Sequence, residues 1–162
     1  MNKTLRQMFR LVIILGLPLI SGCGGSGGFG GSSTVSVSEL GLSLELPPGW
    51  KSERGNLRMM VDAGDPDNRF GLIEDYPAEG KSLKQQVDEM TRFEAASIRS
   101  RQSLTIGGCP AIELVSEAEF ALIEVIVLKG DRIIRVSFRV EKSVFPAQAA
   151  VLRKSLASIR FQ

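Results

Sequence analysis

The chain of 162 residues contains no histidine, one tryptophan, one tyrosine and two cysteines. Histidine is the commonest general base, the usual partner of a serine or cysteine nucleophile, and the commonest metal ligand. Its absence removes most of the support for a hydrolase or a zinc enzyme. Carboxylates and lysines remain available for acid–base chemistry, but no pair of them stands at a spacing that singles it out. We therefore expect a protein that is not an enzyme and has no cofactor.

A strong charge of one sign is also missing. The chain has 20 basic and 18 acidic residues, and three of the basic ones are Lys3, Arg6 and Arg10. Without these three, 17 basic residues face 18 acidic ones, so the remainder is close to neutral. A nucleic-acid partner would require a clustered basic face. We expect no nucleic-acid partner.

The N-terminus has the pattern of a secretory signal. Its basic residues precede an apolar run over residues 11–20, which is too short to span a bilayer but typical of a signal peptide. The run ends in Ile20-Ser21-Gly22-Cys23, which resembles the lipobox of bacterial lipoproteins. This resemblance implies that residues 1–22 are removed and that acyl chains, palmitate among them, are attached to Cys23. Two chains anchor a protein stably to a lipid bilayer. An ordinary signal peptide with an incidental cysteine is the alternative.

Residues 23–38 follow as a tether, since residues 24–34 are almost all glycine and serine and cannot bury apolar surface. A chain of this composition spans roughly 20 Å. Residues 39–162 then form one domain. Gly24 stands where inner-membrane lipoproteins of enterobacteria carry aspartate. In a cell with two membranes we therefore expect the protein at the outer membrane, facing the periplasm.

Cys109 is the only thiol that remains once Cys23 carries lipid, so we expect no intramolecular disulfide. It lies in the sequence Gly107-Gly108-Cys109-Pro110. A free cysteine is usually a small apolar packing residue, and we interpret Cys109 in this way.

The domain alternates between strand and helix patterns. Period-two or continuous apolar runs predict strands over residues 42–46, 57–61, 70–76, 104–106, 112–115, 120–128 and 133–140. The run 120–128 is apolar on both sides except at Glu124, as expected for a central strand. Ser82 and Gln85 form a capping-box pattern, which predicts a helix from there to about residue 98. A second helix is expected over residues 146–157.

Three segments resemble the PsbP-like family: Gly-Leu-Ser-Leu-Glu-Leu-Pro-Pro-Gly-Trp at 41–50, Ile-Gly-Gly-Cys-Pro-Ala at 106–111 and Ser-Leu-Ala-Ser-Ile-Arg-Phe at 155–161. This family includes the photosystem II extrinsic protein and the bacterial periplasmic lipoprotein DcrB. The resemblance covers about residues 40–162. It implies an α+β fold, an α/β/α sandwich around an antiparallel sheet with two main helices. Its motifs are turns and packing residues, which specify fold better than function.

A charged cluster is expected on one face of this sheet. A two-residue turn at residues 130–131 would place Glu124 opposite Ser137, and therefore diagonal to Arg135 and Arg139. One interpretation is a structural acid matched by flanking arginines. The other is a binding face, because arginine suits bidentate contacts with anions and partner carboxylates.

Asp62, Asp65, Asp67 and Asn68 supply hard oxygen ligands of the kind that calcium takes. They lack the EF-hand spacing, and Pro66 fits an ordinary turn, so they are weak metal candidates. Members of the PsbP group have been linked with calcium and manganese, but those sites rest partly on histidines, which this chain lacks.

Two other features have structural interpretations. Trp50, which follows a Pro-Pro-Gly turn, is expected to cap the core rather than serve as an exposed recognition anchor. Met59, Met60 and Met90 are interpreted as core filler rather than a soft-metal site.

The sequence thus predicts a membrane-anchored envelope lipoprotein, held in the lipid bilayer through Cys23, that binds or helps assemble another envelope protein without catalysis. The alternative is a small-ligand or divalent-metal module, with calcium as the metal.

Overall fold

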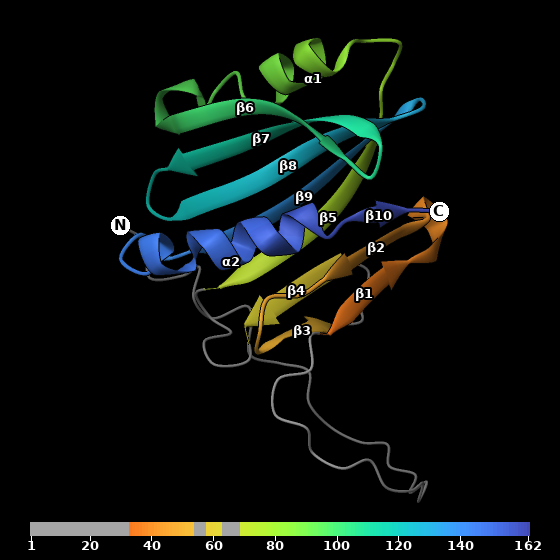
Figure 1. The fold of residues 1–162 in the computed structure, drawn as a ribbon. Coiled ribbons are helices and arrows are strands. Elements are labelled where there is room, and N and C mark those ends of the chain that lie inside the picture. Colours follow the sequence, from red (N-terminus) through yellow and green to blue (C-terminus); the bar gives the residue numbers. More distant parts are fainter. Residues whose placement is uncertain (1–32, 54–57, 63–68) are drawn as a thin grey trace, which may run out of the picture.

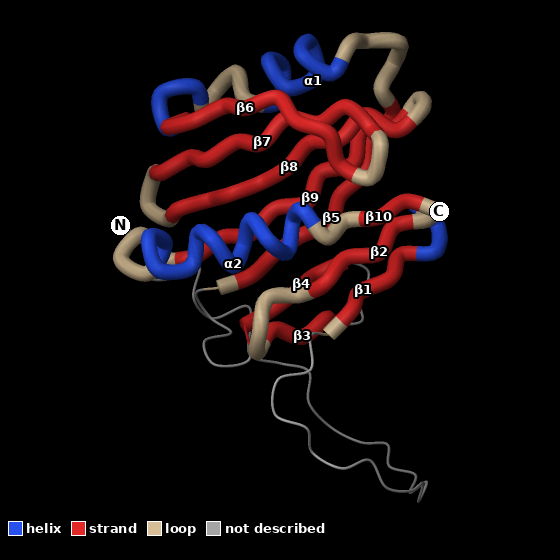
Figure 2. Tube along the Cα trace, in the orientation of Figure 1, coloured by secondary structure: helices blue, strands red, loops and turns tan. Residues whose placement is uncertain are grey.

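Two antiparallel sheets form the framework of the domain in a computed structural model that describes residues 33–53, 58–62 and 69–162 (Figures 1 and 2). The larger sheet has the strand order β3-β4-β5-β9-β8-β7-β6. Its strands are β3 Trp50–Glu53, β4 Arg58–Asp62, β5 Phe70–Pro77, β6 Ile98–Ile106, β7 Cys109–Glu117, β8 Ala121–Lys129 and β9 Arg132–Val140. The smaller sheet has the order β1-β2-β10, with β1 Thr34–Val37, β2 Leu42–Glu45 and β10 Arg160–Phe161.

One helix lies on each face of the larger sheet. The longer helix α2, Phe145–Ala157, packs on the face that carries Val125, Val136 and Phe138 (Figure 1). The short helix α1, Leu83–Met90, packs through Val87 on the opposite face of β7 and β8. This is the α/β/α sandwich with two helices and an antiparallel sheet that the sequence predicts.

The long hairpins follow the predicted turns. Gly130-Asp131 joins β8 and β9 with Lys129 opposite Arg132, and Gly107-Gly108 joins β6 and β7 with Ile106 opposite Cys109. β8 lies between β7 and β9 and is buried along most of its length. Its prediction as a central strand is confirmed.

The main core lies between α2 and the two sheets. Trp50 is 3% exposed, and its ring meets that of Phe138 edge to face, with centroids 5.2 Å apart. Met60 is fully buried beside them, and Cys109 packs against the same core while half-buried. The structural interpretations of Trp50 and Met60 are therefore confirmed. Met90 packs against the smaller core under α1, and the Met59 side chain lies outside the description.

The ends of the described chain meet in the smaller sheet. β2 pairs with β1 on one side and with β10 on the other. The ammonium group of Lys129 donates hydrogen bonds to the carbonyl oxygens of Leu40 and Gln162, at 3.0 and 3.3 Å, and lies over the Phe161 ring. Lys129 thus links the end of β8 to the segment between β1 and β2 and to the C-terminal residue. β1 precedes residue 39, so the sheet includes residues that the sequence assigns to the tether.

The predicted helix over residues 82–98 is wrong in its second half. Helix α1 ends at Met90, where the Thr91 hydroxyl and amide both donate to the carbonyl oxygen of Val87. A turn and a 3-10 segment at Ala95–Ser97 then lead into β6. Phe93, which continues the apolar spacing of α1, is 93% exposed. β6 therefore begins at Ile98, six residues before the predicted strand start at Leu104.

The capping box at the start of α1 is confirmed, and it leads to a prediction. The Ser82 hydroxyl oxygen accepts from the Gln85 amide at 3.3 Å, and the Gln85 side chain accepts from the Ser82 amide at 2.9 Å. Replacing Ser82 by alanine should lower the free energy of unfolding by about 1 kcal/mol, because it leaves an amide at the helix start unpaired. Urea unfolding measures this change. The control is Ser36→Ala in the exposed part of β1, and an equal loss in both variants would contradict the prediction.

Candidate binding site on the α1 side of the sheet

Helix α1 covers only part of its face of the sheet. Its core contacts lie toward the β8–β9 turn and include Ile126 and Ile133. Farther along the same strands, the same face carries charged residues: Glu124 on β8, Arg135 and Arg139 on β9, and Glu74 on β5. We call these four residues the charged cluster. Register places Glu124 opposite Ser137 and Arg135 opposite Glu74, so three neighbouring strands position the cluster.

Arg135 is matched by two carboxylates. Its Nε lies 2.5 Å from a Glu124 carboxylate oxygen, and its Nη1 lies 3.7 Å from Glu74. The Glu124 side chain is 4% exposed. Burial raises the pKa of Glu124 above its usual range, and the Arg135 guanidinium opposes that rise. Glu124 and Arg135 thus form a buried ion pair at the base of the face.

Arg139 does not join this ion pair. Its guanidinium carbon lies 4.3 Å from the ring centroid of Phe70 and 4.0 Å from that of Phe120. Both arginines stand on the predicted face, diagonal to Glu124, but only Arg135 bonds to it. The interpretation in which both flanking arginines match Glu124 therefore holds for Arg135 alone. The reason is that two rings from separate segments meet around Arg139.

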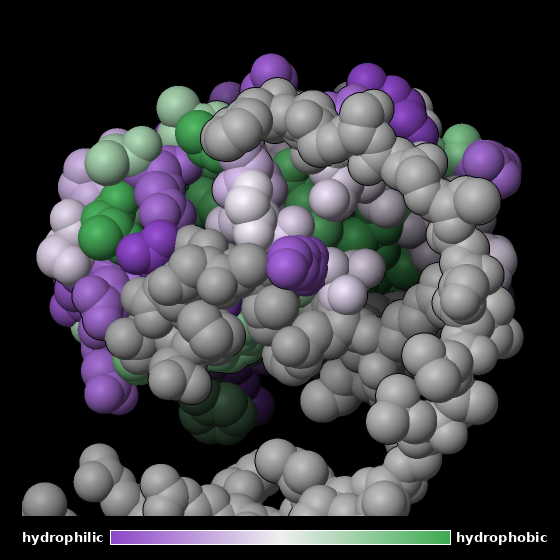
Figure 3. Space-filling model, turned by 90° about the horizontal axis from the view of Figure 1, so that it is seen from below, coloured by the Kyte–Doolittle hydropathy of each residue, from purple (hydrophilic) through white to green (hydrophobic). Residues whose placement is uncertain are grey.

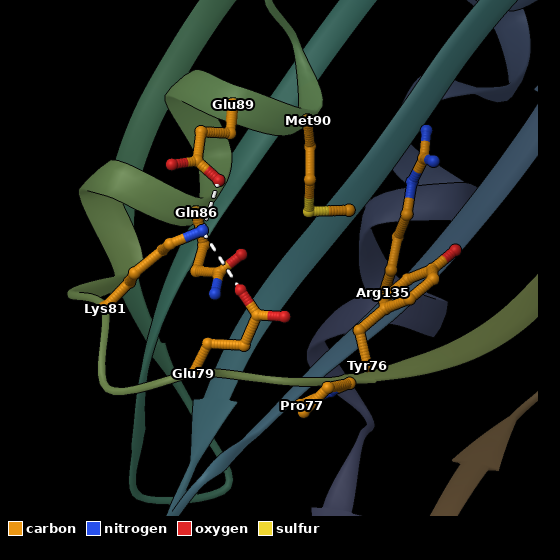
Figure 4. Close-up of a pocket in the computed structure, with 8 residues that line it drawn as sticks. All are labelled: Tyr76, Pro77, Glu79, Lys81, Gln86, Glu89, Met90 and Arg135. Atoms are coloured by element: carbon orange, nitrogen blue, oxygen red, sulfur yellow. Dashed lines mark hydrogen bonds and ion pairs between the residues drawn. The ribbon is translucent and has the colours of Figure 1, made fainter.

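A pocket adjoins the charged cluster between α1 and the end of β5. Its volume is about 380 Å³. The lining residues are Tyr76, Pro77, Glu79, Lys81, Gln86, Glu89, Met90 and Arg135 (Figure 4). Arg135 belongs both to this pocket and to the charged cluster, so we call the two together the binding face.

Opposite charges pair along one wall of the pocket. The Lys81 ammonium donates to Glu89 at 2.7 Å and to Glu79 at 3.1 Å (Figure 4). These hydrogen bonds, that to Glu89 first, raise the pKa of Lys81. Met90 and Tyr76 lie across from them. Burial and the Glu74 carboxylate raise the pKa of Tyr76, so its hydroxyl stays protonated at neutral pH and can donate or accept a hydrogen bond.

Sequence reasoning missed this pocket because its walls come from three separate segments. The residues 77–81 form a turn that had no motif, and Lys81 was not singled out. Tyr76 could have been noticed as the one tyrosine of the chain at the end of a predicted strand.

The other predicted site residues lie elsewhere or outside the description. Asp62 is the last residue of β4, and its backbone stands opposite Trp50. Asp65, Asp67 and Asn68 lie outside the described residues, as does Cys23. Among the residues that the structure describes, no group of three or more His, Cys, Asp or Glu is placed to hold a metal ion. Within the same ranges, no helix combines the length and apolar character that crossing a membrane requires.

Seen from below, the described surface carries many hydrophilic residues with smaller apolar areas between them (Figure 3). Three large apolar side chains are exposed among the described residues: Tyr76 at 38%, Phe93 at 93% and Val151 at 41%. Of these, only Tyr76 lines the pocket.

Comparison with known proteins supports the fold. No protein-family profile matches the chain, and no curated protein matches its sequence. The solution structure of cyanobacterial PsbP from Synechocystis sp. PCC 6803 superposes with a TM-score of 0.59 at 11% identity, over 86% of this chain and 98% of that protein. The fold is therefore PsbP-like, as the sequence resemblance implies.

Two further solved structures are similar. A crystal structure from Bacteroides thetaiotaomicron VPI-5482 gives a TM-score of 0.51 at 18% identity, over 75% of this chain and 45% of that protein. A Pseudomonas aeruginosa protein of unknown function gives 0.47 at 13% identity, over 80% and 96%. At these identities the likeness concerns fold alone.

Proposed function

We propose that this protein is a non-enzymatic envelope lipoprotein, anchored through acylated Cys23, that binds another envelope protein through the binding face. The observation that carries the proposal is the group of polar and aromatic side chains on the α1 side of the sheet, beside α1. There, the exposed Tyr76 and the half-buried Arg135 line a pocket, and Arg139 lies against the rings of Phe70 and Phe120 on the same face of the sheet. Arginine and aromatic residues are enriched in protein interfaces, where they provide most of the binding energy.

The anchor is argued from sequence. The lipobox at residues 20–23 and the glycine- and serine-rich residues after it would hold the domain a short distance from a bilayer. A tether of this kind leaves the domain free to turn its binding face toward a partner in the same membrane. Gly24 favours the outer membrane in a cell that has two.

The proposal predicts that binding depends on both the anchor and the face. The full-length protein is crosslinked in cells, solubilised, captured by affinity and analysed by mass spectrometry, with Cys23→Ala as the unanchored control. A specific envelope protein should be captured with the wild type and lost with Cys23→Ala. Tyr76→Ala should lower its recovery severalfold, because Tyr76 contributes exposed aromatic surface at the pocket.

Val151→Ala is the matched control for Tyr76→Ala. Val151 is exposed to nearly the same degree, at 41% against 38%, and lies on α2 at the opposite side of the sheet. Its recovery of the partner should equal that of the wild type. Equal losses of partner recovery in Tyr76→Ala and Val151→Ala would contradict the assignment of partner binding to the binding face. If the wild type captures no specific partner, the proposed function is contradicted.

The pocket favours a second candidate function, a small-ligand module. Its volume falls at the lower end of the range for small-molecule sites, and it presents ammonium, guanidinium, carboxylate, amide and phenol groups. The calcium version depends instead on Asp62, Asp65, Asp67 and Asn68. A rise in unfolding temperature on adding millimolar calcium would support that version, and an unchanged temperature would remove it.

A further inference from the structure

Arg139 is held between two aromatic rings from distant parts of the chain. Phe70 stands directly opposite it on β5, and Phe120 lies in the turn that precedes β8. The guanidinium carbon is within 4.3 Å of both ring centroids. Such contacts are favourable for arginine, and they restrict the rotation of a long side chain. The planar donor group is therefore largely ordered before any ligand arrives.

No described carboxylate neutralises Arg139. Among the described residues, none forms an ion pair or a hydrogen bond with its guanidinium, and its Nε is buried without an acceptor. Arg135, four residues earlier on the same strand, has two carboxylate neighbours. A buried Nε without an acceptor is unusual, because buried polar groups are nearly always hydrogen-bonded. The Nη groups of Arg139 are not among the buried unpaired atoms and have no described acceptor either, so they can donate to an acceptor on a bound molecule.

We infer that Arg139, clamped between Phe70 and Phe120, binds a carboxylate of an aspartate or glutamate on the partner protein. The inference rests on the proposed function and names the chemistry of the contact. A guanidinium offers parallel N–H donors whose spacing matches a carboxylate, which gives a bidentate and oriented bond. The ring edges, together with Leu122 opposite Arg139 on β8, offer apolar surface to the methylene groups of such a residue.

The neighbouring charges favour a carboxylate over a phosphate group. Glu124 lies two residues along β8 from Leu122, and Glu74 lies on β5 beyond Phe70. Arg135 offsets one of these two negative charges, and Arg139 is the cation of the cluster that has no described carboxylate partner. One guanidinium balances one carboxylate. A dianionic phosphate would leave excess negative charge near the two acids.

Capture from cells tests the contact with the partner. Full-length Arg139→Lys keeps the positive charge but loses the planar donor pair and the stacking. We expect it to recover the partner at least tenfold less than the wild type. Arg153→Lys, on α2 at the other side of the sheet, is the matched control and should recover as much as the wild type. Equal unfolding temperatures would show that the loss is not caused by misfolding.

A titration tests the ligand chemistry without knowledge of the partner. The full-length protein in detergent micelles, labelled with ¹⁵N and ¹³C, is titrated with acetyl-Glu-Glu-Glu-amide while the Arg139 Nε–H signal and the ring signals of Phe70 and Phe120 are observed by NMR. We expect these signals to move with this peptide and not with acetyl-Gln-Gln-Gln-amide. Arg139→Lys should abolish the movement of the ring signals.

The outcomes separate this inference from the proposed function. If a partner is captured equally by the wild type and by Arg139→Lys, the role of Arg139 is wrong and the proposed function stands. If the signals respond to inorganic phosphate at lower concentration than to the glutamate peptide, the carboxylate assignment is wrong. If the wild type captures no partner while the glutamate peptide still moves the Arg139 signal, the proposed function fails and the carboxylate site remains.

Discussion

Replacing Arg135 by alanine should lower the free energy of unfolding by about 3–5 kcal/mol near pH 8. The reason is Glu124, which is 3% exposed and whose carboxylate lies 2.5 Å from Arg135 Nε. Without the guanidinium, the carboxylate is a buried charge with no ionic partner. Removing one member of a buried pair costs far more than the pair itself contributes, since the remaining charge keeps its desolvation penalty.

The loss should become smaller as the pH falls toward 5. Burial already raises the pKa of Glu124, and Arg135 limits that rise. In Arg135→Ala the pKa of Glu124 in the folded protein rises further. The native protein then takes up a proton at Glu124 that the unfolded chain takes up only at lower pH. A group with a raised folded-state pKa loses its stabilising contribution as pH rises through that pKa. The free energy of unfolding that Arg135→Ala loses relative to the wild type therefore grows with pH.

Urea unfolding of the wild type and the variant at pH 8 and pH 5 measures both effects. Arg153→Ala is the control, because it removes an ion pair with Glu113 in which the arginine is 48% exposed, and it should cost less than about 1 kcal/mol. The double variant Glu124→Leu with Arg135→Met should regain most of the lost stability, since it removes both charges and keeps the volume. A deficit in Arg135→Ala that is below 1 kcal/mol, or independent of pH, would contradict this account.

Replacing Phe138 by alanine should lower the free energy of unfolding by about 3–5 kcal/mol at any pH. Phe138 is fully buried and meets Trp50 edge to face. The backbone of β5 shapes its site, because a Cβ on Gly71 would lie 2.8 Å from both the Phe138 ring and the carbonyl oxygen of Ser137. Gly71 is paired with β4 on one side and with β9 on the other, which holds its backbone in place. A cavity therefore remains where the ring was, and its cost adds to the lost transfer energy.

Phe93→Ala is the matched control for this loss. It removes the same atoms from a side chain that is 93% exposed, and its effect should stay within about 0.5 kcal/mol. Urea unfolding measures the free energy of unfolding of both variants. The two values can be compared directly if the dependence of this free energy on urea concentration is unchanged. Similar losses in both variants would show that the packing of Phe138 is not as described.

Local signals in the sequence were enough to predict the β8–β9 hairpin and the position of Glu124 on it. The two-residue turn at Gly130-Asp131 fixes the register, and register decides which residues are diagonal to Glu124. The capping box likewise predicted where α1 begins. These features depend on residues close together in the chain, so no knowledge of the rest of the fold was needed.

The missed elements have identifiable causes. The spacing of Phe93 continues the apolar stripe of α1, but the helix ends at Met90, and the Thr91 hydroxyl donates a hydrogen bond to the carbonyl oxygen of Val87 there. Most of β6 carries exposed polar side chains because it is an edge strand, so it lacks the alternation that predicts strands.

The candidate site was predictable only in part for the same reason. Arg139 could be placed on a face from its own hairpin. Its contact with Phe70 depends on the pairing of β5 with β9. No local pattern in the sequence indicates that these two strands, which are far apart in the chain, are neighbours in the sheet. The pocket beside Arg135 depends on the same pairing, together with the position of α1.

The pairing of β2 with both β1 and β10 determines when the fold can be completed. A chain is synthesised from its N-terminal end, so β2 lacks one of its two neighbouring strands until Phe161 has been synthesised. Contacts between such distant segments make folding slow, because loop-closure entropy must be overcome before they form. Lys129 joins Leu40 to Gln162 at the same junction. The domain should therefore reach its native state only after β10 has been synthesised, and until then its long apolar strands are exposed to aggregation.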